Sequence, residues 1–210
     1  EADIFALEAL RRLAAGNWGV ALELSKWRLP GGRGGDLSQT FWLTRDVQRQ
    51  WLWEWIDAAA RLGLGITDAQ EGYASSPGKL ADLATAYAEK GWELDSLHRR
   101  FAIQTERYAS CNSPSHFQLF VEIRKGLTAL YRAVLDTQSR RWNEACERDG
   151  FLGPPELRQR GFFDRWVRPK LAPGTKTALI LVDALRYELG RDLVAILEKE
   201  GNGKVSIDPL

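Results

Sequence analysis

The sequence KTALILV, residues 176–182, is a short run of β-prone apolar residues near the end of this 210-residue chain. Such a run is typical of a strand that is buried on both faces of a parallel sheet. The residues that follow predict an amphipathic helix to about Glu200, because leucines recur at helical spacing: Leu185, Leu189, Leu193 and Leu197. Residues 204–207 then predict a second strand. Residues 176–207 therefore predict one βαβ crossover, the opening unit of an α/β sheet.

Upstream of this unit the apolar residues recur at three- and four-residue spacing, which predicts helices. We expect these helices at residues 3–16, 17–28, 44–62, 79–90, 94–108 and 115–148. The helix at 44–62 carries Trp51, Trp53 and Trp55 on more than one face, as is typical of a helix at the centre of a bundle. The glycine-rich residues 31–35 predict a surface loop, and the turn-rich residues 63–78 predict an irregular segment.

The chain is therefore predicted to be mainly α and to have two parts. A multi-helix domain covers residues 1–174, and the first βαβ unit of an α/β domain covers residues 175–210. One such unit leaves its strand edges unpaired and its faces uncovered, so we expect the sheet to be incomplete here. The absence of methionine and the start at Glu1 favour an internal segment of a longer protein.

Composition excludes several classes of function. The 29 basic and 28 acidic residues nearly cancel, so no whole-molecule attraction to nucleic acid or to a membrane is expected. The apolar run at residues 177–182 is far shorter than the ~20 residues of a bilayer span, and from the start at Glu1 we expect no signal peptide. Cys111 and Cys146, with only His98 and His116 beside them, lack zinc-site spacing. We expect buried, reduced thiols in a cytoplasmic protein.

Asp183 is the most informative polar residue, because it follows the first predicted strand directly. Open α/β sheets collect ligand-binding and catalytic groups at the carboxyl ends of their strands. The alternative role is a helix N-cap, since an aspartate there accepts hydrogen bonds from the first free amides. On spacing alone we favour the cap.

Residues 177–188, TALILVDALRYE, resemble the start of the PglZ domain, a branch of the alkaline phosphatase superfamily found in BREX-type phage-defence systems. Residues 91–101, GWELDSLHRRF, are similar to the helical region that precedes that domain, through Trp92, Asp95, Arg99 and Arg100. The resemblance implies that Asp183 corresponds to the first metal-ligand aspartate after strand one. Arg186 would be a family position near the site, or else a solvent-facing helical residue.

The chemistry implied by the resemblance uses two divalent cations, commonly zinc. One cation polarises the phosphoryl oxygens and the other lowers the pKa of a Thr or Ser nucleophile. The family's nucleophile and remaining ligands would lie beyond Leu210, so no catalytic residue is expected in this chain. Asp183 alone cannot hold a catalytic zinc, which needs about three protein ligands. The resemblance therefore implies a metal-dependent phosphoesterase as the parent protein, and a chain that is inactive and binds no metal by itself.

A basic strip, residues 157–176, is the other candidate site. Asp164 is the one acidic residue in this strip. Its basic residues are Arg158, Arg160, Arg165, Arg168, Lys170 and Lys176. Phe162, Phe163 and Trp166 lie between them, and basic residues with aromatics can bind phosphates and stack on bases. We favour the alternative, a short amphipathic helix that docks the two domains with its aromatics inward and its arginines outward. Arg140, Arg141 and Arg148 would widen a nucleic-acid patch.

Two functions remain open for the helical part. The first is a scaffold that docks other proteins of a phage-defence complex, in keeping with its tryptophan content and balanced charge. The second is a nucleic-acid-binding module that uses the basic strip. A phosphoacceptor domain ranks low, because such domains use a paired acidic cluster where this chain has Asp183 alone.

Overall fold

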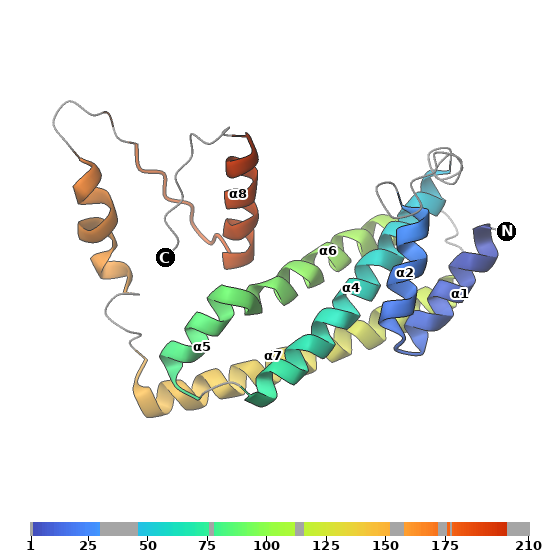
Figure 1. Ribbon diagram of the computed structural model, residues 1–210, viewed down its shortest axis with the longest axis horizontal. Helices are drawn as coiled ribbons and strands as arrows, with labels where there is room; N and C mark the ends of the chain where they lie inside the picture. Colours follow the sequence, from blue (N-terminus) through green and yellow to red (C-terminus); the bar gives the residue numbers. More distant parts are fainter. Residues whose placement is uncertain are drawn as a thin grey trace. The chain divides into compact units, whose positions relative to one another are not determined.

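The computed structural model describes residues 2–29, 46–75, 78–111, 116–151, 158–171, 176 and 178–200. Throughout these ranges the regular secondary structure is helical (Figure 1). The chain divides into two compact units, residues 1–75 with 93–138 and residues 76–92 with 139–210. The predicted boundary between residues 174 and 175 is not tested by this division and stays a prediction.

The first unit is a bundle of long helices. It contains α1 (Ala2–Ala14), α2 (Trp18–Arg28), α4 (Val47–Ser75), nearly all of α6 (Trp92–Ala109) and the larger part of α7 (Phe117–Asp149). The helices expected from apolar spacing are confirmed. Gly16 ends the first of them in the left-handed region, at φ 74°, where glycine has no steric cost.

The tryptophan-rich helix α4 lies at the centre of the bundle, as predicted. Trp53 and Trp55 are fully buried. The Trp55 ring packs on aromatic rings of α6 and α7, with centroid distances of 6.0 Å to Phe101, 6.2 Å to Tyr108 and 4.8 Å to Phe120. Aromatic pairs at these distances add stability beyond their buried area. One helix thus organises the core through side chains on several of its faces.

The helix α4 extends beyond its predicted end at residue 62 and includes most of the segment expected to be irregular. The reason is packing at its glycines. A Cβ on Gly63 would lie 2.3 Å from Cδ2 of Trp18, and one on Gly65 would lie 2.7 Å from Cδ1 of Leu97. These glycines therefore allow α2 and α6 to pack closely against α4 and do not form a turn. The packing outweighs the low helix propensity of glycine.

The second unit has a small core where α5 (Leu80–Ala86) meets the end of α7. Leu80, Ala145 and Cys146 are buried there, with Leu83 packed against them. The Leu80 amide donates a hydrogen bond of 2.8 Å to Oδ2 of Asp149, so the last residue of α7 caps the first turn of α5. A π-helical turn, η1 (Tyr87–Gly91), then joins α5 to α6. The unit also contains the short turns η3 (Gln159–Gly161), η4 (Phe163–Val167) and η5 (Arg168–Lys170), followed by α8 (Tyr187–Glu200).

The predicted βαβ unit is confirmed only in its helix, α8. Residues 178–182 have no regular secondary structure, and Ile180 and Leu181 are 83% and 79% exposed. A strand exists through hydrogen bonds to a neighbouring strand, and the described part of the chain supplies no such neighbour. The second predicted strand, residues 204–207, and the glycine-rich residues 31–35 both lie outside the described residues.

Two smaller expectations can also be compared with the structure. Cys111 and Cys146 are both free and buried, as predicted. Among the helices described, none is long and apolar enough to cross a membrane.

Candidate functional site

Asp183 lies in an exposed turn ahead of α8. The next residue, Ala184, has a φ of 54°, a left-handed conformation that is uncommon for a residue with a Cβ. The amides of Leu189 and Gly190, in the first turn of α8, donate to the carbonyl of Arg186, both at 3.0 Å. Arg186 therefore occupies the N-cap position, and the interpretation of Asp183 as the cap is wrong. The Asp183 carboxylate lies in the turn itself, three residues before the cap.

Arg186 and Glu188 form an ion pair at the start of α8. The Arg186 Nε lies 2.8 Å from Oε1 of Glu188, and the side chain of Glu188 is 1% exposed whereas that of Arg186 is 58% exposed. The distance is short, but this Oε1 accepts no hydrogen bond of good geometry among the described residues. Sequence reasoning missed the burial of Glu188. Its only local signal is an acid in the first turn of a helix, which more often marks an exposed residue that favours the helix dipole.

The described residues do not by themselves fit a catalytic metal. No three His, Cys, Asp or Glu side chains cluster within them, and a catalytic zinc needs about three such ligands. His98 instead stacks on Tyr131 with ring centroids 3.8 Å apart, between α6 and α7. The role of Asp183 as a metal ligand therefore stays a prediction, and no catalytic step is assigned to a metal here.

Asp95, one of the residues behind the upstream resemblance, joins two helices of the bundle. The Tyr131 hydroxyl on α7 donates a hydrogen bond of 2.8 Å to Oδ1 of Asp95 on α6. Together with the ring of His98 one turn later, this contact holds α6 against α7. Asp95 and His98 thus serve helix packing in the first unit.

A pocket of about 200 Å³ opens in the first unit between α4 and α6. Its polar lining is Glu54, Asp57, Arg61, Arg100 and Gln104, and its apolar lining is Leu29, Ala58 and Leu97. Sequence analysis did not single out this group, because its members lie on helices far apart along the chain. Acids and bases alternate around the pocket, so it has no strong preference for a charged ligand.

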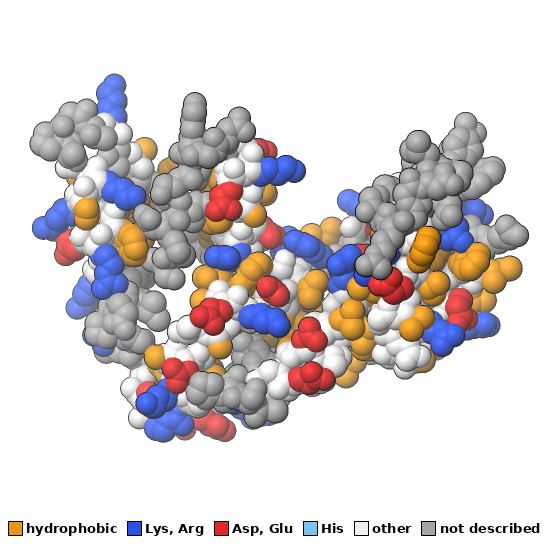
Figure 2. Space-filling view, in the orientation of Figure 1, with side chains coloured by type: hydrophobic (Ala, Val, Ile, Leu, Met, Phe, Trp, Pro, Cys, Tyr) orange, Lys and Arg blue, Asp and Glu red, His pale blue; other side chains and the backbone are white. Residues whose placement is uncertain are grey.

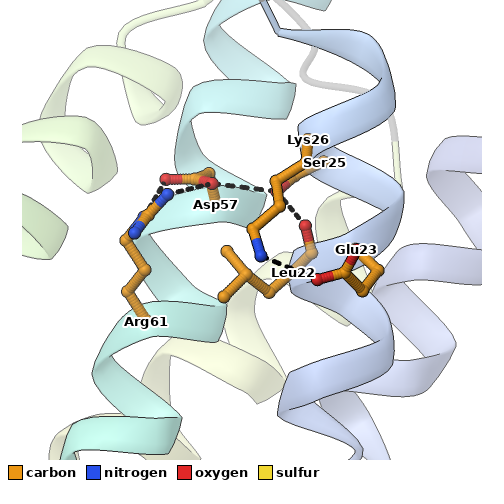
Figure 3. A network of polar contacts seen from close by, with 6 residues as sticks. All are labelled: Leu22, Glu23, Ser25, Lys26, Asp57 and Arg61. Atoms are coloured by element: carbon orange, nitrogen blue, oxygen red, sulfur yellow. Dashed lines mark hydrogen bonds and ion pairs between the residues drawn. The ribbon is translucent and has the colours of Figure 1, made fainter. Parts of the chain in front are cut away.

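The acids of this pocket are already paired, and Figure 3 shows the contacts of one of them, Asp57. The Arg61 guanidinium contacts Asp57 through Nε at 2.6 Å and Nη2 at 3.3 Å. The fully buried Ser25 hydroxyl of α2 lies 2.9 Å from Oδ1 of Asp57, with the Leu22 carbonyl as its alternative acceptor at 2.8 Å. Arg107 likewise contacts Glu54 at 2.9 Å. The contact between Ser25 and Asp57 fastens α2 to α4.

Residues 159–170 of the basic strip are folded as the consecutive short turns η3, η4 and η5. Its cations are exposed side chains: Arg158, Arg160, Arg165, Arg168, Lys170 and Lys176. Arg168 lies 2.7 Å from Asp164 in an exposed ion pair. Figure 2 shows Lys and Arg side chains with hydrophobic ones between them on this segment, which is orange in Figure 1.

The prediction that the aromatic residues of the strip face inward, as in a helix that docks the two domains, is only partly met. Val167 is buried and Trp166 is half-buried, as an inward-facing side would require. Phe162 and Phe163, however, are 38% and 47% exposed. Large exposed aromatics beside arginines are the combination that stacks on bases, so the structure leaves the nucleic-acid alternative open.

Comparison with known families matches residues 162–210 to the BREX system PglZ alkaline phosphatase-like domain. The match confirms the resemblance of residues 177–188 and extends upstream of it into the basic strip. It includes Asp183, Arg186 and all of α8. No curated protein and no solved structure gives a significant match.

Proposed function

We propose that this chain is part of a PglZ-type, phosphohydrolase-like protein that acts in a bacterial BREX antiphage-defence system. The observation that carries the proposal is the match of residues 162–210 to that family. The turn at Asp183 supports it, because an exposed carboxylate ahead of a helix is open to ligands. We place the helical domain at residues 1–174 and the start of the PglZ domain at residues 175–210, in the cytoplasm.

The parent protein, in this proposal, binds a divalent metal, zinc, through Asp183 and ligands outside the described residues. One carboxylate supplies one of the bonds that a catalytic zinc requires. The chain is therefore proposed to be inactive by itself, and hydrolysis is proposed for the parent protein.

The test uses the natural full-length protein that contains this chain. Hydrolysis of p-nitrophenyl phosphate and bis-p-nitrophenyl phosphate is measured together with the zinc content of the purified protein. Asp183→Asn should lower hydrolysis at least about a hundredfold and lower the zinc content, since a ligand to a catalytic metal is lost. Glu198→Gln, an exposed carboxylate on α8, is the matched control and should change neither.

The two parts of this proposal fail separately. A full-length protein that hydrolyses neither ester and holds no metal would contradict the phosphohydrolase. Full activity and full zinc content in Asp183→Asn would contradict the assignment of Asp183 alone.

For the helical domain we propose a scaffold that docks other proteins of the defence complex. Large apolar side chains are exposed on two neighbouring helices, Ile4 and Phe5 on α1 and Val20 and Trp27 on α2. The Arg28 guanidinium lies 4.5 Å above the Phe5 ring and adds a cation to this surface. Exposed aromatics beside arginine are enriched at protein interfaces.

This scaffold is tested by purifying the full-length protein together with the other proteins of the same defence system. Trp27→Ser should reduce their recovery several-fold. Trp142→Ser, an exposed tryptophan on α7, is the matched control and should leave recovery unchanged. Unchanged recovery with Trp27→Ser would argue against docking through α1 and α2.

The second candidate function is nucleic-acid binding through the basic strip, and the exposure of Phe162 and Phe163 favours it. Binding of single-stranded and double-stranded DNA is measured over a range of salt concentrations. Replacing Arg165 and Arg168 by alanine should weaken binding and lower the salt slope by about two, roughly one for each lost phosphate contact. Replacing Arg11 and Arg12, exposed basic residues of α1, removes the same charge and should have a smaller effect. Identical binding by both double variants would dispose of this candidate.

A further inference from the structure

The π-helical turn η1 changes the hydrogen bonding between α5 and α6. The Trp92 amide donates to the carbonyls of Tyr87 and Lys90. In a continuous α-helix that amide would donate to the carbonyl four residues earlier, which belongs to Ala88. The π register therefore diverts the amide that an α-helix would supply to Ala88. Such π turns occur frequently at functional positions.

A side chain of α8 bonds to that carbonyl. The Tyr187 hydroxyl donates a hydrogen bond of 3.2 Å to the carbonyl oxygen of Ala88. The ring of Tyr187 also packs on the ring of Tyr87, with centroids 5.9 Å apart and planes tilted by 56°. The first residue of α8 is thus joined to the π turn by a polar contact and an aromatic contact.

A second contact lies one helical turn further along α8. The Arg191 guanidinium carbon lies 5.3 Å from the centroid of the Trp92 ring, within the range of a cation–π interaction. Tyr187 and Arg191 are four residues apart, so they lie on the same face of α8. That face therefore meets the first residue of the π turn, Tyr87, and the residue that directly follows the turn, Trp92.

We propose that the π turn Tyr87–Gly91 is the docking site of α8, and that the π register and the docked position of α8 stabilise each other. If the turn reverted to an α-helix, the Trp92 amide would donate to the Ala88 carbonyl, and the Tyr187 hydroxyl would have to share that acceptor. The same change would rotate Tyr87 relative to Trp92, so the two ring contacts could not both persist. Conversely, the loss of α8 would remove the hydrogen bond that the Tyr187 hydroxyl donates to the Ala88 carbonyl.

Gly91 is suited to this arrangement. A Cβ at residue 91 would lie 3.0 Å from Cδ2 of Tyr87, so a larger residue would push this ring away from Tyr187. The docking site also lies outside residues 162–210, whereas α8 lies inside them. Residues before the family match therefore hold the first helix of the matched segment in place.

The test is hydrogen–deuterium exchange of the full 210-residue chain, read by mass spectrometry at residues 87–93 and 188–200. Tyr187→Phe keeps the ring and removes only the hydroxyl. Exchange should become faster by about fivefold in both segments, the effect of losing one hydrogen bond. Lys199→Ala, an exposed position on the same helix, is the control and should change neither segment.

Arg191→Gln supplies an independent variant, because it removes the cation above Trp92 and leaves Tyr187 in place. It should also accelerate exchange in both segments. Faster exchange in α8 without any change at residues 87–93, or no change in either segment, would overturn the coupling. The measurement requires no hydrolase activity, so its outcome is independent of the proposed function.

Discussion

The indole ring of Trp18 on α2 lies directly against the backbone of Gly63 on α4. A Cβ at residue 63 would lie 2.3 Å from Cδ2 and 2.7 Å from Cγ of that ring, distances that real Cβ atoms do not adopt. The two helices can pack this closely only because residue 63 has no side chain. The glycine thus permits a contact between residues that are far apart in the sequence.

Gly63→Ala should therefore destabilise the first unit. Forcing a methyl group into a well-packed contact costs about 1–3 kcal/mol in the free energy of unfolding. Gly126→Ala on α7 is the matched control, because a Cβ there meets no atom within 4 Å. It should raise stability by about 0.5–1 kcal/mol through helix propensity. Urea unfolding followed by tryptophan fluorescence measures both changes, and equal stability of the two variants would contradict the packing argument.

Thr105→Val should expose the dependence of the core on one buried hydrogen bond. The Trp55 Nε1–H donates to Oγ1 of Thr105 at 3.0 Å, and both residues are buried. Valine keeps the shape but leaves the indole donor unsatisfied, which costs about 1–3 kcal/mol. Thr128→Val is the control, since the Thr128 hydroxyl bonds its own helix at an exposed site. That change should stay within about 0.5 kcal/mol in the same urea experiment. A similar loss in both variants would show that the buried bond is not the cause.

The start of α5 should depend on pH through Asp149. The hydrogen bond from Arg148 and then the one from the Leu80 amide lower the pKa of Asp149. Because the folded-state pKa lies below the unfolded value, the stabilisation is present above the unfolded pKa and is lost as pH falls through the folded one. The protection factor of the Leu80 amide should therefore fall in acid, below the usual aspartate pKa of about 3.9.

Asp149→Asn should show weak protection of the Leu80 amide already at neutral pH, with little further change in acid. Asp136→Asn, an exposed position on α7, should keep the wild-type profile. If the Leu80 amide of Asp149→Asn still loses its protection in acid as the wild-type amide does, then a group other than Asp149 causes that loss.

The two thiols should be unreactive in the folded chain. Burial raises the pKa of Cys111, and the carboxylate of Asp46 raises it further, so little thiolate forms at neutral pH. Cys146 is buried in the second unit. A thiol reagent such as dithionitrobenzoate at pH 7 should modify neither cysteine until urea unfolds the protein. Fast modification of either thiol without urea would contradict this prediction and show local opening at that site. The control is Lys199→Cys, whose exposed thiol should react at once and so shows that the reagent is active.

The helices could largely be predicted from the sequence, whereas the end of α4 could not. Gly63 and Gly65 are turn signals when only their neighbours in the sequence are considered. In the structure the side chains of Trp18 and Leu97 pack directly against these two glycines, and this packing stabilises the helix. The strand predicted at residues 176–182 is not confirmed for a related reason, since apolar residues form a strand only where another strand pairs with them, and the described residues contain none.

The candidate site rests on a residue chosen from the sequence, whose role stays a prediction, and only the structure describes its surroundings. Asp183 was identified from its place between apolar residues and a helix, and the family match includes it. The burial of Glu188 and the contact of Tyr187 with Ala88 depend on where α8 packs. Neither of these has a distinctive local pattern.

Local spacing alone was sufficient to locate the helices and the PglZ-like segment, because a helix closes its hydrogen bonds within four residues and a family motif is a contiguous string. Three-dimensional packing decided the rest: which glycines lie inside a helix, which acids are paired, and where the π turn meets α8. Those outcomes depend on contacts between residues tens of positions apart, and such contacts form only once the helices have come together.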